Sequence, residues 1–151
     1  MEYALLGSWD PKWIRDHKDW LAIYGEHSDG WKNTIKQENI DLLVATEQRV
    51  GYVWFYAYLP KSRGGDMKIH HRLKINTIQY SKELYATRHI LKGVDLKHHD
   101  TPINYDARLT FNVVGIEDIE PIAPQKFITS KNENVKGGPQ LLRVLVIQNN
   151  G

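Results

Sequence analysis

Cysteine is absent from the 151 residues of the chain. This absence excludes a disulfide scaffold and thiolate metal sites, and it is compatible with a reducing compartment. No apolar run approaches the roughly 20 residues that a helix needs to span a bilayer. The N-terminus also lacks the basic and apolar regions of a signal peptide. We therefore expect a soluble, cytoplasmic protein that makes no contact with a membrane.

Net charge and catalytic fingerprints are also scarce. The formal net charge is +2, so strong binding to nucleic acid would require local clusters of basic residues. The sequence contains no nucleophile elbow, P-loop, HExxH or dinucleotide-binding motif. His70 and His71 are adjacent on a predicted strand and point to opposite faces, and residues 98–100 (His-His-Asp) lack a further ligand at fixed spacing. We therefore expect neither a metal nor a cofactor.

The sequence does contain a long predicted β-hairpin at its centre. Residues 50–59 are rich in β-branched and aromatic side chains and are apolar on both faces, as in a central strand that is covered on both sides. Residues 67–80 alternate between an apolar face and a row that contains Arg72 and Lys74, which we expect to lie in water. A Gly-Gly turn at 64–65 joins the two predicted strands.

Shorter elements are predicted before and after this hairpin. Before it, the pattern predicts a strand at 2–6 that stops at Gly7, a helix from Asp10 to Tyr24, a weak helix at 32–39, a strand at 41–46 and a turn at 47–49. After it, the pattern predicts a helix at 82–91, a loop at 97–102, a strand at 103–114, an irregular connection at 117–127 broken by Pro121 and Pro124, and a final strand at 140–147. This mixture predicts an α+β fold, a small barrel or strongly curved sheet flanked by two or three helices. The length predicts one domain over 1–151.

Several motifs, taken in order, resemble a known superfamily. The segment with Tyr105 and Arg108 (Asn-Tyr-Asp-Ala-Arg), then an alternating strand and residues 122–128, resembles the later half of EVE domains of the PUA-like superfamily. Residues 32–34 (Lys-Asn-Thr), which follow a tryptophan-bearing loop, resemble the early part of the same family. The basic, glycine-bearing loop at 132–140 is similar to a loop of the related YTH domains.

The resemblance implies a PUA-like (EVE/YTH-like) barrel that holds a flipped-out modified base between aromatic walls. Trp31 is our first choice for a wall because it lies in a polar loop with no apolar neighbours in sequence. Trp20 is the alternative wall, and Tyr105 is expected to close the cage from another strand. The base-binding candidates are Trp31, Trp20, Tyr105, Asn33 and Thr34. Each of the three aromatic residues has a structural alternative in packing. Trp54, within an apolar strand, is predicted to belong to the core, with the alternative that it lines the barrel and faces the pocket.

Basic residues are the candidates for contacts with the nucleic-acid backbone. They cluster on the hairpin and on the last loop, near aromatic residues, as a phosphate track requires. The alternative is that they form an ordinary solvated face. The Lys136-Gly137 turn also offers backbone amides to a phosphate. The full set is Lys32, Arg72, Lys74, Arg108, Lys131, Lys136 and Gly137.

These expectations favour a binding module without enzymatic activity. The expected partner is DNA or RNA that carries a modified, methylated base, and we expect the module to be the specificity domain of a restriction or regulatory protein, fused to or associated with a nuclease or NTPase subunit. The rival interpretation is a small hydrolase of modified nucleosides, because the related ASCH domains use a lysine, a threonine and a glutamate, for which Lys32, Thr34 and Glu47 are the matching types. A third alternative is a protein-interaction domain.

Overall fold

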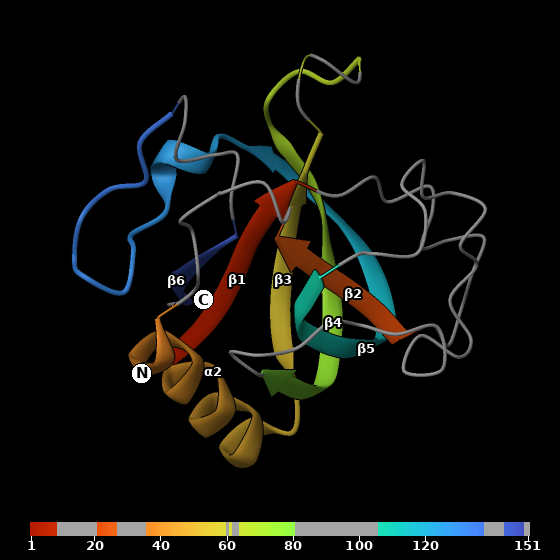
Figure 1. The fold of residues 1–151 in the computed structure, drawn as a ribbon. Helices are drawn as coiled ribbons and strands as arrows, with labels where there is room; N and C mark the ends of the chain where they lie inside the picture. Colours follow the sequence, from red (N-terminus) through yellow and green to blue (C-terminus); the bar gives the residue numbers. More distant parts are fainter. Residues whose placement is uncertain are drawn as a thin grey trace.

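The fold combines a mixed six-stranded sheet, of order β2-β5-β4-β3-β1-β6, with helix α2 (Figure 1). The computed structural model describes residues 1–8, 21–26, 36–59, 61, 64–80, 106–137 and 144–149, and for 21–26, 79–80 and 106–110 it describes the backbone alone. The elements are β1 (Glu2–Ser8), β2 (Leu21–Glu26), α2 (Gln37–Val50), β3 (Val53–Tyr58), β4 (Ile69–Tyr80), β5 (Asp106–Ile122), the 3-10 turn η3 (Pro124–Lys126) and β6 (Leu145–Asn149). The predicted α+β class is therefore confirmed.

The central hairpin lies where the sequence predicts it. β3 pairs antiparallel with β4, with Phe55 opposite Leu73, and it pairs in parallel with β1, with Phe55 opposite Leu5. Both faces of β3 are covered: Phe55 belongs to the hydrophobic cluster on one face, and Tyr56 and Tyr58 belong to the cluster on the other. β3 is thus a central strand that is buried on both sides.

Helix α2 covers the first face of the sheet. Its buried side chains Ile40 and Leu43 pack with Phe55 and Leu73 in one cluster. The predicted strand at 41–46 is therefore wrong, since this apolar segment lies inside the helix. A short apolar run fits a strand and a buried helix equally well, so periodicity alone does not distinguish them here. The helix ends at Gly51, whose φ of 93° is a left-handed conformation that glycine adopts without strain.

Strand β5 continues well beyond its predicted end. The irregular connection expected from residue 117 begins only after Ile122, and its short helical part is η3. Pro121 does not stop the strand because β2 pairs only with Asp106–Asn112 of β5, so the later half of β5 has β4 as its only partner among the described strands. A proline without an amide proton is tolerated on such an edge.

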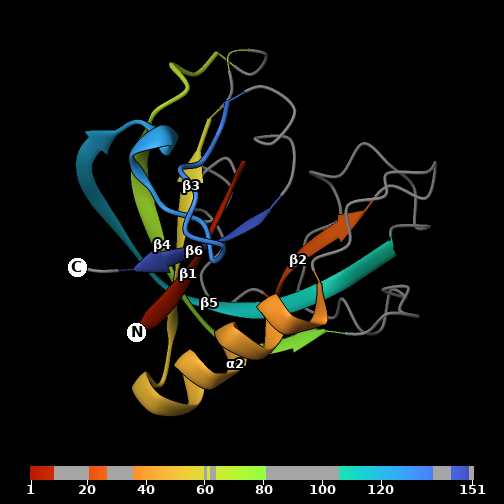
Figure 2. The ribbon, with the colours of Figure 1, turned by 90° about the vertical axis from the view of Figure 1, so that its left-hand side faces the viewer.

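The sheet is strongly twisted and curved. In Figure 2, β3 stands upright, while β2 and the neighbouring part of β5 extend to its right in a clearly different direction. The β4–β5 pairing contains three register shifts, one of them between Asn76 and Gln79, and such bulges bend a strand and increase its twist. The described strands run from β2 at one edge to β6 at the other, without a pairing between those two. The barrel remains a prediction.

The remaining predicted elements have mixed outcomes. The predicted helix from Asp10 to Tyr24 is wrong at its end, because residues 21–24 belong to β2, and its earlier part lies outside the described residues. Gly7 does not stop the first strand, which reaches Ser8. The final strand is confirmed at 145–147, and 140–143 lie outside the described residues, as do the helix at 82–91 and the loop at 97–102. In the described part of the chain, no helix is long and apolar enough to cross a membrane.

The second face of the sheet is covered at one end by the segment that follows β5. Phe127 packs on Tyr56, with ring centroids 4.8 Å apart, and Val135 is buried in the same cluster. The buried members of this cluster are Ala4, Leu6, Tyr56, Tyr58, Ile69, Val135 and Ile147. Residues 124–137 therefore lie on the face opposite α2, which is also the face that carries the basic row of β4.

Candidate nucleic-acid interface

Two aromatic and two cationic side chains lie together on the second face of the sheet. The guanidinium carbon of Arg72 lies 3.8 Å from the centroid of the Trp54 ring, and the Lys74 ammonium lies 4.0 Å from the centroid of the Tyr52 ring. The rings of Tyr52 and Trp54 meet edge to face, with centroids 5.4 Å apart. We call these four residues the aromatic–cation face.

Strand register produces this arrangement. Trp54 is directly opposite Lys74, and Tyr56 is opposite Arg72, so Arg72 reaches Trp54 along the diagonal between neighbouring rows. Because side chains alternate between the two faces along each strand, Trp54 and Tyr56 lie on the same face as Arg72 and Lys74. The predicted basic row in water is therefore corrected: Arg72 and Lys74 are half-buried because their side chains lie across aromatic rings.

Arg72 is held on both sides. Its Nε donates a hydrogen bond to Glu117 of β5, with which it also forms an ion pair, and its Nη1 lies 3.5 Å from the Tyr56 hydroxyl oxygen. That hydroxyl in turn donates to Asn149 Oδ1 at 3.0 Å. Burial opposes the charge of Arg72, but the hydrogen bonds to Tyr56 and Glu117 outweigh it and raise the pKa of Arg72. Arg72 is therefore a fixed, charge-compensated member of the face.

Lys74 has a different electrostatic environment. No carboxylate lies within 4 Å of its ammonium group among the residues that the structure describes. Its contacts are the ring of Tyr52 and, at 6.0 Å, the ring of Trp54. Aromatic faces attract a cation but carry no net charge. The positive charge of Lys74 is thus available to an anion that approaches this face.

The predicted basic loop adjoins the same face. Lys131, Lys136 and Gly137 are exposed in the segment that follows Phe127, and Phe127 packs on Tyr56 beside Arg72. A network of hydrogen bonds gives the loop its shape, since Gln148 Nε2 donates to Asn132 Oδ1 at 2.6 Å and to the Thr129 carbonyl at 3.1 Å. Phe127 and Tyr56 thus connect this loop to Arg72 of the aromatic–cation face.

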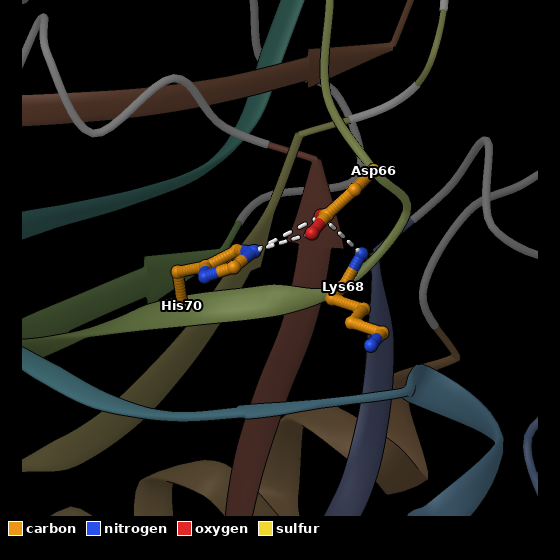
Figure 3. A network of polar contacts seen from close by, with 3 residues as sticks. All are labelled: Asp66, Lys68 and His70. Atoms are coloured by element: carbon orange, nitrogen blue, oxygen red, sulfur yellow. Dashed lines mark hydrogen bonds and ion pairs between the residues drawn. The ribbon is translucent and has the colours of Figure 1, made fainter.

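The hairpin histidines form two separate pairs with carboxylates. His70 Nε2 lies 2.9 and 3.0 Å from the two carboxylate oxygens of Asp66, which also accepts the backbone N–H of Lys68 (Figure 3). The amide of Lys68, followed by the hydrogen bond to His70, lowers the pKa of Asp66. His71 Nδ1 lies 2.7 Å from Asp118 Oδ1 on β5. These pairs brace β4 at the end where it enters the sheet.

A metal site does not emerge from these histidines or from other side chains of the described segments. Within those segments, no three histidine, aspartate or glutamate side chains gather as ligands of one ion. The close approach of Asp66 to His70 and of Asp118 to His71 instead gives each imidazole a carboxylate partner of its own.

Glu47, the glutamate of the rival hydrolase interpretation, is engaged with backbone. Its carboxylate accepts the N–H groups of Thr77 and, at 3.2 Å, Ile78, at the bulge of β4. Thr77 has a φ of 53°, which is unusual for a β-branched residue. Thr46, the preceding residue of α2, accepts the N–H of Tyr3 at 3.1 Å. The end of α2 therefore anchors both β1 and the bulge.

Most of the other predicted site residues lie in parts of the chain that the structure does not describe. Those that lie outside the described residues are Trp20, Trp31, Lys32, Asn33, Thr34 and Tyr105. Arg108, described by its backbone alone, lies at the register shift between β2 and β5. The aromatic cage therefore stays a prediction.

Sequence reasoning missed the part that Trp54 and Tyr52 play. Trp54 does pack against the second cluster, as its predicted core role requires, but it also presents a ring face to Arg72. The available signal was the alternation of tyrosine and tryptophan at 52–58, which faces the basic row of the next strand. The sequence predicts an irregular connection from residue 117, but Glu117 lies in β5 and is the ion-pair partner of Arg72.

Comparison of the chain with protein-family models, with curated proteins and with solved structures found no significant match. The function of this chain is therefore inferred from the aromatic–cation face and from the basic loop.

Proposed function

We propose that this chain is a nucleic-acid-binding module that recognises a modified base. The observation that carries the proposal is the aromatic–cation face, where Lys74 lies on Tyr52 and Arg72 lies on Trp54. Nucleic acids present negative phosphates and flat π-systems together. A surface that combines cations with aromatic rings is complementary to both features.

The charge distribution supports contact with phosphate at two places. Lys74 has no carboxylate partner among the described residues, whereas the charge of Arg72 is compensated by Glu117. Lys131 and Lys136 are exposed on the loop beside the face. Contacts of this kind position a strand without reading its sequence. We therefore assign these lysines to the backbone and look for base recognition elsewhere.

For base recognition we propose a pocket in a PUA-like, EVE/YTH-like barrel. Trp31 is the first wall, with Trp20 and Tyr105 as the other candidates and with Asn33 and Thr34 beside them. A flipped base is read by stacking between aromatic walls and by hydrogen bonds to its edge. The module would act as the specificity domain of a restriction or regulatory protein that attacks or controls modified DNA or RNA.

The role of Glu47 supports the binding module over the rival hydrolase. A catalytic glutamate in the barrel pocket needs a carboxylate that is available to substrate or water. The carboxylate of Glu47 is instead engaged by the amides of Thr77 and Ile78. Glu47 therefore has a structural role at the end of α2, and this role requires no catalytic activity.

The salt dependence of binding tests the proposal. We expect Lys74→Gln to weaken binding to every oligonucleotide and to reduce the slope of log K against log salt by about 1, as for the loss of one phosphate contact. Lys68→Gln is the matched control because Lys68 is an exposed lysine of the same hairpin and lies off the aromatic rings. An unchanged slope for Lys74→Gln, or an equal change for Lys68→Gln, would contradict the assigned role of this face.

A further inference from the structure

A glycine on β5 continues the row that begins with Trp54 and Lys74. Gly115 is directly opposite Lys74, and Lys74 is directly opposite Trp54, so the three residues form one row across β3, β4 and β5. The next row contains Tyr56, Arg72 and Glu117 in the same order. Each position of this second row carries a large side chain, whereas the first row ends in a residue without one.

Neither backbone conformation nor crowding requires glycine at this position. Gly115 does not have a positive φ, and a Cβ built on it would meet only the Cβ of Lys74, at 3.6 Å, which is an ordinary van der Waals contact. A glycine inside a strand weakens the strand, and it often marks a bulge or a place where a ligand or another backbone approaches closely. Gly115 adjoins the register shift of the β4–β5 pairing between Lys74 and Ile75. The neighbouring Val114 is 53% exposed, and Gly115 itself is partly exposed.

The chemistry around this open position favours an anionic, flat ligand. Lys74 supplies a positive charge without a carboxylate partner among the described residues, and its ammonium lies on the ring of Tyr52 and 6.0 Å from the centroid of the Trp54 ring. Arg72, fixed by Glu117, extends the platform with a planar guanidinium. Bases stack on aromatic rings and on guanidinium planes.

We infer that the aromatic–cation face and Gly115 form a second nucleic-acid site, which takes an unpaired base of a single strand. The base lies over Gly115 beside Lys74, and the adjoining phosphate contacts the ammonium group. A paired base is already stacked between its neighbours in a duplex, so its ring cannot lie flat on this sheet. The inference rests on the proposed function only in that the chain binds nucleic acid, and it is independent of the modified-base pocket.

Filling the open position tests this inference without removing any existing contact. Gly115→Val places a β-branched side chain beside Lys74, where we expect it to fit the strand and block a base. We expect the affinity for an unmodified, fluorescein-labelled single-stranded 12-mer to fall about tenfold, within the range of one lost stacking contact. Val114→Thr is the control, since it changes the neighbouring exposed residue. Gly115→Ala adds only one methyl group, so we expect it to reduce the affinity less than Gly115→Val does. It replaces Gly115→Val in the test if the valine variant does not fold.

Single-stranded and duplex probes distinguish an unpaired base from a paired one as the occupant of this site. The same 12-mer as a duplex should bind more weakly to the wild-type protein and should be insensitive to Gly115→Val. An unchanged single-strand affinity in folded Gly115→Val and Gly115→Ala would overturn the inference, as would equal losses for single strand and duplex. If the wild-type protein binds neither probe, the proposed function and the inference both fail. If it binds single strands but does not discriminate a modified base, only the modified-base proposal fails.

Discussion

Removing the carboxylate of Glu47 should loosen the bulge of β4 and lower the stability of the whole sheet. Glu47 accepts two consecutive amides at a point where Thr77 has a φ of 53°. Hydrogen bonds to a charged group contribute about 1.5–3 kcal/mol each in buried settings. Because Thr77 is exposed and Glu47 is half-buried, we expect a loss of about 2 kcal/mol in total for Glu47→Ala and less for Glu47→Gln, which keeps one acceptor.

Urea and thermal unfolding measure this effect. A loss of about 2 kcal/mol corresponds to a decrease of about 4–8 °C in the melting temperature of a domain of this size. Glu133→Gln is the matched control, because Glu133 is an exposed carboxylate whose side chain makes no hydrogen bond or ion pair to the described residues. Thr77→Gly should raise the melting temperature, since glycine adopts a positive φ without strain.

The variants at Glu47 and Thr77 can refute the proposed role of this contact. If Glu47→Ala and Glu47→Gln unfold at the same urea concentration as the wild-type protein, the carboxylate does not hold the bulge. A hydrolase interpretation would predict that result, together with the loss of an activity. Destabilisation by Thr77→Gly would likewise contradict the view that Thr77 is strained.

The remaining predictions concern the predicted cage, the basic loop and a buried phenol. Trp31→Ala should abolish discrimination of the modified base and leave the melting temperature unchanged, whereas Trp54→Ala should lower the stability by about 3 kcal/mol; equal losses of melting temperature would place Trp31 in the core. The double change Lys131→Gln and Lys136→Gln should weaken binding to all sequences alike and flatten the salt dependence; altered base preference with an unchanged salt slope would make the loop part of the pocket. Burial raises the pKa of Tyr58 to about 12, so the folded state keeps the proton that the unfolded chain loses near pH 10. The neutral phenol of Tyr58 is therefore compatible with the folded state below pH 10, and the free energy of unfolding falls as the pH rises through 12. The Tyr58 hydroxyl has no hydrogen-bond partner in the described part of the chain, so Tyr58→Phe should be at least as stable as the wild-type protein at pH 8. Between pH 10 and 12, its free energy of unfolding in urea titrations should depend less on pH than that of the wild-type protein. The same pH dependence in both proteins would contradict the contribution of Tyr58.

The hairpin was predictable because its signal is local. Alternation along 67–80 and the double apolar face of 50–59 define two strands, and the turn glycines join them. Helix α2 was not, because its apolar segment at 41–46 is too short for periodicity to separate helix from strand. Gly51 is a typical residue at the C-terminal end of a helix, and it does mark the end of α2.

Features that depend on distant partners could not be read from the sequence. The passage of β5 through Pro121 follows from where β2 ends along it. The stacking of Arg72 on Trp54 follows from the β3–β4 register, which places the two residues on a diagonal. The sequence placed Arg72 and Lys74 correctly among the basic residues of β4, but it could not show that aromatic rings lie beneath them.

Binding of modified and unmodified oligonucleotides to the wild-type protein tests the central claim most directly. Matched single-stranded and duplex probes would carry N6-methyladenine, 5-methylcytosine, 5-hydroxymethylcytosine or no modification, at one fixed salt concentration. We predict that one modified probe binds more tightly than its unmodified counterpart by about 1–3 kcal/mol, the contribution of one stacked and hydrogen-bonded base. Equal affinity for every modified and unmodified probe would contradict the account.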